Sequence, residues 1–526
     1  MAGQPHSLER RSVVSSFIFQ FPNDPVHKPL VALFKRSAQV STYQHRIAPI
    51  SGSIDHEDSN PLAAAWRELS EETTLIPSSV AFWRTGKPFS FVDESVGREW
   101  TIHPFAFRLK EGVRESAIET DWEHEEWQWY DPTAVTNDAE FERTGIPHLR
   151  ESLRRVWFEG EINDTAGRAL REGLERMHND HESGSHELTS IALRIFREFL
   201  IHTQAGIRDA KWWEDVQMAA WHLVKNGRES MGAATLNALL AILEEMEEIW
   251  RLEEPPGEKV ERMLTIVDHH LKARTSRSGL VKEAFSSYLR SHFGSSAQKK
   301  KLTILTLSNS STIRDSIVEA FASLDIATLE MRILESRPCF EGVDYAYSLK
   351  SNFQAQLKDI PDKRLLIALY PDSSAALAAQ GVDVVLLGAD RISRSKGVSN
   401  KIGSLPVVLG AKHHTPNAKV IVLSELEKVN GENGMIDDEK HEDNDPEEVI
   451  RAWRNVGVKG ADVILPQQDS NSTVEVKNIY FEWVPLSLID AFISGEGILN
   501  DVRILQKANQ QEELASRYFD SISIRY

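Results

Sequence analysis

The sequence predicts a multidomain protein in which an α+β domain is followed by a helical domain and then by an α/β domain with a parallel sheet. The chain has 526 residues, which is more than one hydrophobic core usually serves. Between residues 165 and 295, apolar residues recur at helical spacing. From residue 300 onward, short β-rich runs alternate with helical ones, and this alternation predicts parallel strands joined by right-handed crossovers.

The first domain, expected over residues 8–155, combines strand-like runs with one amphipathic helix. The helix is predicted over residues 62–75, where Leu62, Ala65 and Leu69 supply an apolar stripe. Strands on both sides of a helix in the sequence are typical of an α+β domain. The strand-like runs are residues 13–21, 29–34, 101–107 and 125–132.

The same helix carries a cluster of carboxylates that favours a metal site. At about 3.6 residues per turn, Glu68, Glu71 and Glu72 share one face, and Arg67 stands beside them. Hard divalent cations prefer clustered carboxylate oxygens, and magnesium commonly bridges such carboxylates to substrate phosphates. The alternative is a solvated helix with ordinary pairs of Glu and Arg.

The spacing Arg-Glu-Leu-x-Glu-Glu in residues 67–72 resembles the second half of the Nudix box, the signature of hydrolases that split nucleoside diphosphates linked to another group. The first half departs from the box, because Gly52 and Asp58 each stand one position earlier than the motif requires, which implies a longer loop. Thr74 replaces the glycine that follows the paired glutamates. Since threonine adopts the left-handed conformation poorly, we expect an altered helix end.

This resemblance implies an α+β Nudix fold for the whole first domain and a role for each residue of the motif. Glu68, Glu71 and Glu72 would hold Mg²⁺ (or Mn²⁺) during attack of water on a diphosphate. Arg67 would orient the carboxylates or the phosphate, so Arg67 and Glu68 are the catalytic residues expected here. A nucleoside diphosphate sugar is the substrate class to test first.

The composition excludes several broad classes of protein. With 79 acidic and 60 basic side chains, the formal net charge is -19, which argues against broad nonspecific binding to nucleic acid or to anionic membranes. The single cysteine, Cys339, allows no intrachain disulfide and no cysteine-based zinc site. The first residues are polar and no run of about 18 apolar residues occurs, so we expect a cytoplasmic protein without a membrane segment.

The rest of the chain divides into a helical domain, expected over residues 165–295, and an α/β domain over residues 300–526. Parallel sheets bind ligands beyond the carboxyl ends of their strands, where several polar segments fall in this sequence. Residues 430–449 are dense in Asp and Glu, and we interpret them as a mobile solvated loop rather than a metal site. The β-rich runs are residues 302–307, 327–334, 365–369, 382–387 and 420–423.

Polar residues near the ends of these runs favour a pocket for a sugar phosphate or nucleotide. Arg337 and Lys401 are cations suited to phosphate, and Asn400 in a glycine-flanked segment can donate hydrogen bonds. Lys428 would add another cation. For each basic residue alone, a surface salt bridge is an equally good interpretation. Together, at their motif spacing, they favour a ligand site.

Four ordered motifs resemble the superfamily that contains the alpha, beta and delta regulatory subunits of eukaryotic initiation factor 2B, methylthioribose-1-phosphate isomerase and ribose-1,5-bisphosphate isomerase. The resemblance spans roughly residues 170–526. It implies a Rossmann-like α/β domain, a homodimer formed through that domain, and a ligand-binding role for Arg228 in a loop of the helical domain. The motifs are Gly227 to Gly232, Glu335 to Gly342, Gly388 to Gly403 and Tyr480 to Gly497.

In the isomerases of this superfamily, a cysteine after the first sheet strand works with the aspartate of the Gly-Ala-Asp motif to move protons between aldose and ketose. The aspartate is present here as Asp390, whereas the cysteine position is Ser308. A hydroxyl is a much weaker acid than a thiol, so we expect ligand binding without efficient isomerisation. Cys339 follows a different strand and is interpreted as a small packing residue.

The function expected is that of a magnesium-dependent Nudix-type hydrolase of a nucleoside diphosphate derivative, fused to a module that binds a sugar phosphate or nucleotide. Hydrolysis of a nucleoside diphosphate sugar would yield a sugar phosphate, which is the ligand type expected in the second module. Two alternatives stay open. One is a regulatory protein without turnover, and the other is an active sugar-phosphate isomerase whose acid is supplied by another group.

Overall fold

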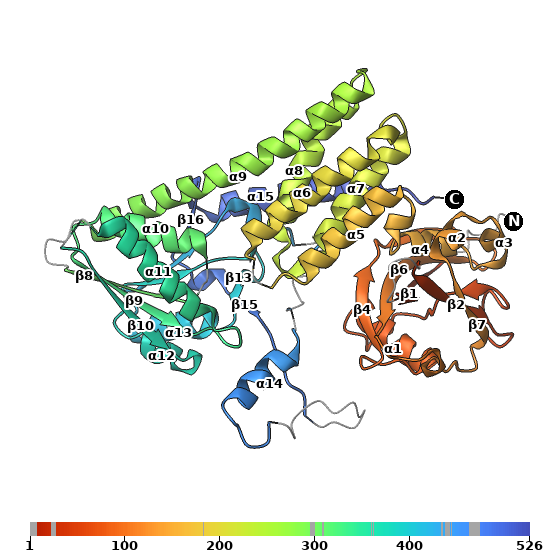
Figure 1. Cartoon of the computed structure of the whole chain (residues 1–526), viewed down its shortest axis with the longest axis horizontal. Helices are drawn as coiled ribbons and strands as arrows, with labels where there is room; N and C mark the ends of the chain where they lie inside the picture. Colours follow the sequence, from red (N-terminus) through yellow and green to blue (C-terminus); the bar gives the residue numbers. More distant parts are fainter. Residues whose placement is uncertain are drawn as a thin grey trace, which may run out of the picture. The chain divides into compact units, whose positions relative to one another are not determined.

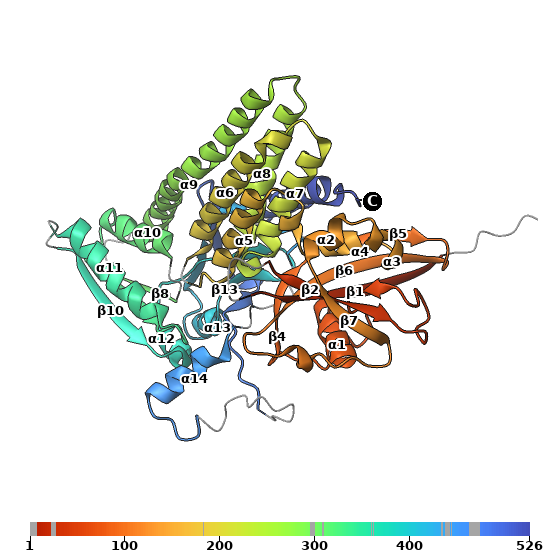
Figure 2. The same ribbon diagram turned by 45° about the vertical axis from the view of Figure 1, so that its right-hand side comes forward.

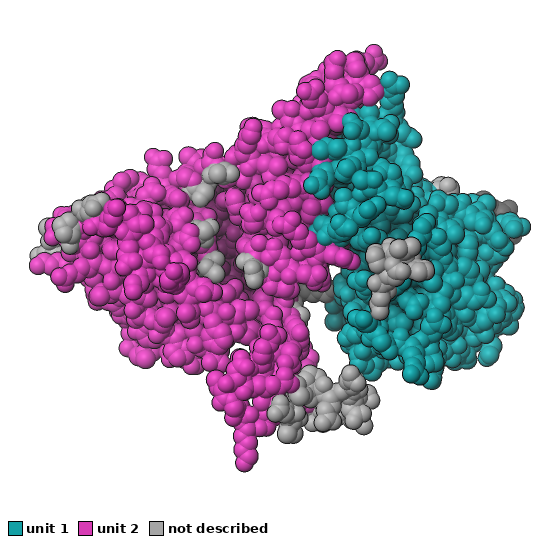
Figure 3. All heavy atoms as spheres, viewed as in Figure 1, with its two compact units in different colours: residues 1–174, 198–222, 522–526 teal, residues 175–197, 223–521 magenta. Residues whose placement is uncertain are grey.

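The computed structural model of the chain forms two compact units, which are coloured separately in Figure 3. The first unit comprises Met1–Leu174, Glu198–His222 and Ile522–Tyr526, and the second unit comprises Glu175–Arg197 and Leu223–Ser521. Both contain helices and strands, which confirms the mixed content expected from the sequence. The structure describes residues 8–22, 28–181, 183–294, 300–307, 310–358, 360, 362–432, 435–436, 442, 444–461 and 474–525.

Within the described residues, a seven-stranded mixed sheet forms the centre of the first unit. Its strands are β1 (Glu9–Gln20), β2 (Leu30–Arg36), β3 (Ile47–Ala48), β4 (Val80–Thr85), β5 (Phe89–Asp93), β6 (Arg98–Leu109) and β7 (His124–Tyr130). The strand order is β3-β2-β1-β6-β4, with β5 added on β6 and β7 on β2. Strands β1 and β6 run parallel, and the other pairs are antiparallel.

Helices cover both faces of this sheet, as Figures 1 and 2 show. On one face, Leu69 of α1 (Pro61–Thr73) shares a core with Val14 of β1. On the other face, Phe17 of β1 shares a core with Leu153, because residues an odd number of positions apart point to opposite sides of a strand. The helices on the second face are α2 (Pro132–Asn137), α3 (Glu140–Thr144) and α4 (Leu149–Arg154).

Helix α1 begins where a capping residue and a proline favour a helix start. Asn60 is the N-cap, and its side chain accepts a hydrogen bond from the backbone amide of Ala63 at 3.0 Å. Pro61 occupies the first turn, where a backbone N–H would have no helical partner. The carboxylate-bearing helix therefore lies close to the range predicted from the sequence.

Long helices follow the first sheet in the sequence. They are α5 (Asp164–His178), α6 (Ser185–Thr203), α7 (Ala210–Lys225), α8 (Ala233–Trp250) and α9 (Pro256–Phe293). Pro256 opens α9 rather than interrupting a helix. Helices α8 and α9 lie side by side in both ribbon views (Figures 1 and 2). In the part of the chain that the structure describes, no helix combines the length and apolar character needed to cross a bilayer.

The described residues of the second unit contain another seven-stranded sheet. Its strands are β8 (Lys301–Thr306), β9 (Thr328–Leu334), β10 (Arg364–Tyr370), β11 (Val384–Leu387), β14 (Lys419–Leu423), β16 (Ala491–Ser494) and β17 (Gly497–Leu499). The order is β10-β9-β8-β11-β14-β16-β17, and all neighbours are parallel except β16 and β17. Each of the five β-rich runs of the sequence forms one of the parallel strands.

Helices also cover both faces of the second sheet. They are α10 (Ser311–Ala322), α11 (Glu341–Leu357), α12 (Ala375–Ala378), α13 (Ser404–His414) and α15 (Asp501–Ala515). Ile304 of β8 shares a core with Leu349 of α11. The next residue, Leu305, shares the opposite core with Val407 of α13. This layered arrangement leaves the ends of the strands as the place where loops can build a site.

The second unit also contains a small antiparallel sheet, which the sequence did not lead us to expect. Its strands alternate in the sequence with strands of the parallel sheet. It consists of β12 (Arg391–Ser393), β13 (Gly397–Lys401) and β15 (Phe481–Val484), in that order. The pairing joins Asn400 to Glu482 and Lys401 to Phe481. It therefore brings together two motifs that are about eighty residues apart in the sequence.

The acidic stretch expected as a loop over residues 430–449 ends in a helix instead. Helix α14 spans Pro446–Asn455, and the side chain of Asp445 caps it by accepting from the Glu447 amide at 2.9 Å. An aspartate followed by a proline is a favourable helix start, which explains the difference. The residues 433–434, 437–441 and 443 lie outside the described part of the chain.

Candidate functional sites

Arg67 of α1 holds three carboxylates around its guanidinium. It donates hydrogen bonds to Asp58 at 2.8 Å, to Glu68 at 2.8 Å and to Glu71 at 3.1 Å. The hydrogen bond with Asp58 is the main reason that the pKa of Arg67 is raised. Asp58, which stands one position away from its place in the sequence motif, therefore still reaches the arginine of the helix.

Gly52 lies directly against the carboxylate of Glu68, and this contact leaves no room for a side chain. A Cβ atom added to Gly52 would stand 2.0 Å from Glu68 Oε1. Glu68 is partly buried, and burial raises its pKa although Arg67 opposes the shift. The loop before α1 thus brings both Gly52 and Asp58 to the helix motif despite its unusual length.

Glu72 is the most buried of the three glutamates on α1. Its carboxylate lies 2.5 Å from His124 Nε2, and both side chains are almost fully buried. Among the described residues, its second oxygen, Oε1, has no hydrogen-bond partner. Burial, together with the nearby Glu123 carboxylate, raises the pKa of Glu72 well above its ordinary value. Burial also lowers the pKa of His124 to about 4.

These carboxylates have the chemistry of a magnesium site, but they do not form a finished one. The three glutamates of α1 and Glu123 offer hard oxygen ligands, and the partnerless oxygen of Glu72 suits a cation. In the described part of the chain, however, no three His, Cys, Asp or Glu side chains are grouped so that they could hold a metal ion. Glu68 and Glu71 bind Arg67 instead. An ion here would have to draw them away from the arginine.

The expectation of an altered helix end at Thr74 is wrong. Thr74 adopts the left-handed conformation, with φ of 58°, and its amide donates to the Ser70 carbonyl at 3.0 Å, as a glycine cap would. A left-handed non-glycine residue costs on the order of 1–2 kcal/mol. The structure accommodates this strain, so the helix ends in the same way as it would with glycine.

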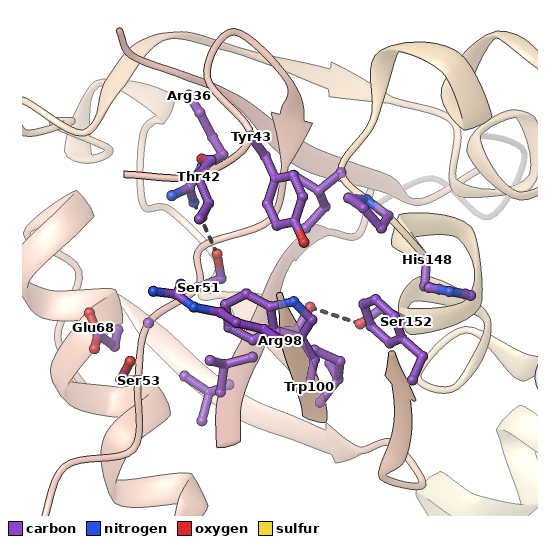
Figure 4. Close-up of a pocket in the computed structure, with 18 of the residues that line it drawn as sticks. Arg36, Thr42, Tyr43, Ser51, Ser53, Glu68, Arg98, Trp100, His148 and Ser152 are labelled. Carbon is purple, nitrogen blue, oxygen red and sulfur yellow. Dashed lines mark hydrogen bonds between the residues drawn. The ribbon is translucent and has the colours of Figure 1, made fainter. Parts of the chain in front are cut away.

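A cavity of about 300 Å³ opens beside Glu68 (Figure 4). Figure 4 shows Glu68 at one side of the cavity, His148 and Ser152 at the opposite side, and Tyr43 and Trp100 between them. These residues come from α1, from the loop after β2, from β6 and from the region where α4 begins. Of the three glutamates of α1, Glu68 is therefore the one that lines this cavity.

Aromatic side chains form part of the walls of this cavity, and polar and aliphatic residues form the rest. Phe91 contacts His148 with ring centroids 4.1 Å apart, and the Arg98 guanidinium lies 5.2 Å from the centroid of the Trp100 ring. Such surfaces suit a flat ring, which can stack on them. The sequence did not reveal these residues, because they come from strands and loops that are far apart in the chain. The same holds for His124 and Glu123.

The second unit contains a larger cavity, of about 420 Å³, next to the carboxyl ends of β8, β11 and β14. Ser308 lies outside the described residues, but Leu307 and Ser310 on either side of it line the cavity. Five of the residues predicted from the sequence line the same space, and these are Arg228, Asp390, Asn400, Lys401 and Lys428.

Arg337 is not among the residues that line this cavity. Its guanidinium donates to Glu335 at 2.8 Å and lies 5.2 Å from the centroid of the Phe340 ring, and its side chain is half exposed. Its backbone amide donates to Asp372 at 2.8 Å. The structure thus gives Arg337 a local ion pair and does not bring it to the other predicted ligand residues.

The charged groups of the second cavity are arranged around a partly buried aspartate. Burial raises the pKa of Asp390, although Lys428, Arg228 and Lys401 oppose the shift. Lys401 Nζ pairs with Glu341 at 2.5 Å and lies 4.3 Å from the centroid of the Tyr480 ring. Three cations around one carboxyl group suit a ligand that carries negative charge.

The two sites and the two sheets define a chain that joins two recognisable modules. It belongs to the initiation factor 2 subunit family, whose family model matches residues 182–501, and it carries a NUDIX domain over residues 10–149. Both resemblances inferred from the motifs are thereby confirmed.

Curated relatives and solved structures are similar to parts of the chain. The methylthioribose-1-phosphate isomerase of Zea mays is 27% identical over 210 residues, covering 39% of this chain and 52% of that protein. The putative methylthioribose-1-phosphate isomerase of Methanothermobacter thermautotrophicus is 34% identical over 168 residues, covering 32% and 46%. The chain thus spans about half the length of these two relatives. The tetrameric eIF2B-beta2-delta2 complex from C. thermophilum has a TM-score of 0.46 at 12% identity, covering 68% of this chain and 98% of that chain.

Proposed function

We propose that the NUDIX domain is a magnesium-dependent hydrolase of a nucleoside diphosphate derivative. The observation that supports this most is the position of Glu68. It lines the cavity of the first unit and accepts a hydrogen bond from Arg67 at 2.8 Å. A diphosphate bound at this end of the cavity would meet the carboxylate cluster of α1. The remainder of the substrate would lie along the aromatic rings in its walls.

In the proposed reaction, bound Mg²⁺ would polarise the diphosphate and lower the pKa of the attacking water. Glu68, Glu71 and Glu72 are the residues that would hold the ion. Arg67 orients Glu68 and Glu71 through its hydrogen bonds, and His124 fixes the carboxylate of Glu72 at 2.5 Å. These contacts hold the carboxylates before any ligand enters, and the ion would have to replace Arg67 at Glu68 and Glu71.

Aromatic rings in the walls of the cavity support a nucleoside as one half of the substrate. A nucleobase has two flat faces, and stacking on aromatic side chains contributes about 1–3 kcal/mol per base. Tyr43, Phe91 and Trp100 offer such faces within the cavity. The substrate class that we propose first is a nucleoside diphosphate sugar, whose cleavage yields a nucleoside monophosphate and a sugar phosphate.

Glu71→Gln and Glu72→Gln should each abolish magnesium-dependent hydrolysis of such compounds while the fold stays intact. The matched control is Glu126→Gln, which removes the same charge from an exposed glutamate 3.7 Å from Lys35. Product analysis and circular dichroism of all three variants test this. Undiminished turnover in both α1 variants would remove these glutamates from the reaction.

We propose for the second cavity that it binds a sugar phosphate or nucleotide without isomerising it. The support is the gathering of Arg228, Lys401 and Lys428 with Asn400 around Asp390. The isomerase mechanism of the resembling enzymes needs a thiol at the position of Ser308, where a hydroxyl cannot serve efficiently near neutral pH. In this proposal, a helical domain over residues 165–295 is followed in the sequence by a Rossmann-like binding domain over residues 300–526. Two copies of the chain form a homodimer through the second of these domains.

Ribose 5-phosphate should raise the melting temperature of the wild type by mass action and should not be converted to a ketose. Lys401→Ala should remove most of that shift. The control Lys412→Ala, which removes a cation paired with Asp490 at 2.8 Å outside the cavity, should keep it. Robust conversion that survives Ser308→Ala would instead support an active isomerase with another acid.

A regulatory protein without turnover is the second candidate for the whole chain. Two observations favour it. The described residues contain no group of side chains that could hold a metal ion, and Glu68 and Glu71 are bonded to Arg67. Isothermal titration with Mg²⁺ separates the candidates. Binding that Glu72→Gln weakens supports the hydrolase, whereas the absence of binding supports the regulatory protein.

A further inference from the structure

Arg228 reaches the second cavity with its hydrogen-bonding groups already engaged by a carboxylate. Its side chain is almost fully buried and lines the cavity. The Nε and Nη2 groups donate to the two oxygens of Glu442 at 3.2 and 2.8 Å, and Nη1 donates to the Asp180 carbonyl at 2.8 Å. This paired geometry is the one with which arginine also binds phosphate.

Glu442 is held firmly in this position. The hydroxyl of Ser230 also donates to its carboxylate, and the amide of Tyr480 lies 3.4 Å from its backbone carbonyl. Burial is the largest influence and opposes ionisation of Glu442, but the hydrogen bonds and charge of Arg228, together with Ser230 and Asn444, lower its pKa on balance. Glu442 is therefore a carboxylate anion at neutral pH, and it is matched to the arginine that faces it.

Glu442 comes from the acidic stretch between β14 and β15, more than two hundred positions from Arg228 in the sequence. The carboxylate has the charge and the two acceptor oxygens of a bound ligand group. The arginine fork therefore binds an internal anion.

We propose that Glu442 is a built-in competitor, which occupies the anion-binding position at Arg228 and must be displaced by the phosphate of an incoming ligand. This inference rests on the proposed function of the second cavity as a phosphate-binding site. It assigns a regulatory role to the acidic stretch. The competitor lowers the affinity for simple anions, so that only a ligand with further contacts in the cavity displaces it.

The test is titration of Glu442→Gln and of the wild type with ribose 5-phosphate and with inorganic phosphate, at constant pH and ionic strength. The amide keeps the shape of the side chain but removes its charge, so both probes should bind at least about tenfold more tightly to the variant. The control is Glu447→Gln, which removes a charge from the same stretch at a half-exposed pair with Arg454 and should leave both affinities unchanged.

Three outcomes would overturn the proposal, and they are distinguishable from one another. Equal affinities in the wild type and Glu442→Gln would refute competition while leaving phosphate binding intact. Weaker binding in the variant would show that Glu442 builds the site. No binding to either protein would refute both the competitor and the proposed binding function. If Glu442→Gln unfolds, Ser230→Ala, which removes a second donor to the carboxylate, should tighten binding in the same direction.

Discussion

Arg67 shows how a single side chain can organise a site before its ligand arrives. Its hydrogen bonds to Asp58, Glu68 and Glu71 gather carboxylates that would otherwise repel one another. Exposed ion pairs contribute little to stability, typically about 0–1 kcal/mol, so the value of this network lies in positioning. Gly52 completes the arrangement, because it is the residue against which the Glu68 carboxylate rests.

Gly52→Ala should reduce hydrolysis by about a hundredfold or more, because the added methyl group would displace the Glu68 carboxylate and misplacements of about 1 Å are that costly. Initial rates with saturating Mg²⁺ measure the effect. Gly257→Ala is the control, since a Cβ there meets open space. Equal rates for both variants would mean that the position of Glu68 does not matter for the reaction.

His222 should make the first unit less stable as the pH falls. It is fully buried beside Phe158, and burial lowers its pKa well below the ordinary value of 6.5. Below about pH 6.5 the unfolded chain takes up a proton that folded His222 does not, so stability is lost at up to about 1.4 kcal/mol per pH unit. Melting curves between pH 7.5 and 5.5 should show this slope, and His222→Phe should reduce it by the share of one proton, because buried His124 of the same unit also contributes. An unchanged slope would contradict the assignment.

The sequence was sufficient for those site residues whose relationship is local. Helical periodicity places Arg67, Glu68 and Glu71 together, and the structure has them within hydrogen-bond distance. His124 contacts Glu72 from a strand that begins about fifty residues later, and no local pattern could have linked them. Thr74 was misjudged because this exposed residue adopts the left-handed conformation, with its amide bonded to Ser70 and its hydroxyl donating to the Ala117 carbonyl at 3.4 Å.

At the scale of elements, helix α13 depends on a strand that lies far away in the chain. Glu482 of β15 accepts hydrogen bonds from the amides of Gly403 at 2.6 Å and Leu405 at 3.0 Å, at the start of α13. These amides have no partner within the helix, so a carboxylate stabilises them. The contact also fixes the segment just after Lys401. This contact explains why the motifs Gly388 to Gly403 and Tyr480 to Gly497, which are far apart in the sequence, both contribute to the second cavity.

Glu482→Ala should destabilise the start of α13 by about 1 kcal/mol, the usual effect of losing a helix cap. Hydrogen exchange of peptides that cover residues 403–408 should become faster. The control is Glu496→Ala, which removes an exposed partner of Arg503 and should leave this exchange unchanged. Equal exchange in all proteins would show that Glu482 is not the cap.

The elements themselves differed in how far the sequence could predict them. The five parallel strands were visible as apolar runs because both faces of their sheet are covered. The strand Gly397–Lys401 is short and polar, and it is completed only by pairing with Phe481–Val484. Its existence depends on that distant partner, so no local signal predicted it.

At the scale of the whole molecule, each unit has a cavity of its own. We propose that the hydrolase releases a sugar phosphate and that the second cavity binds this class of compound. The two activities should then be separable by mutation. Glu72→Gln should abolish hydrolysis and leave binding of ribose 5-phosphate unchanged. Lys401→Ala should remove most of the binding of ribose 5-phosphate and leave hydrolysis unchanged. Loss of both functions in either variant, with the fold intact, would contradict two independent sites.

The most direct measurement of the central claim is phosphorus NMR of the wild-type chain mixed with a panel of nucleoside diphosphate sugars and Mg²⁺. We expect the diphosphate resonances of at least one compound to be replaced by those of a nucleoside monophosphate and a sugar phosphate, and a chelator to stop the reaction. Unchanged diphosphate resonances for every compound, at high protein concentration and with Mg²⁺ present, would contradict the claim.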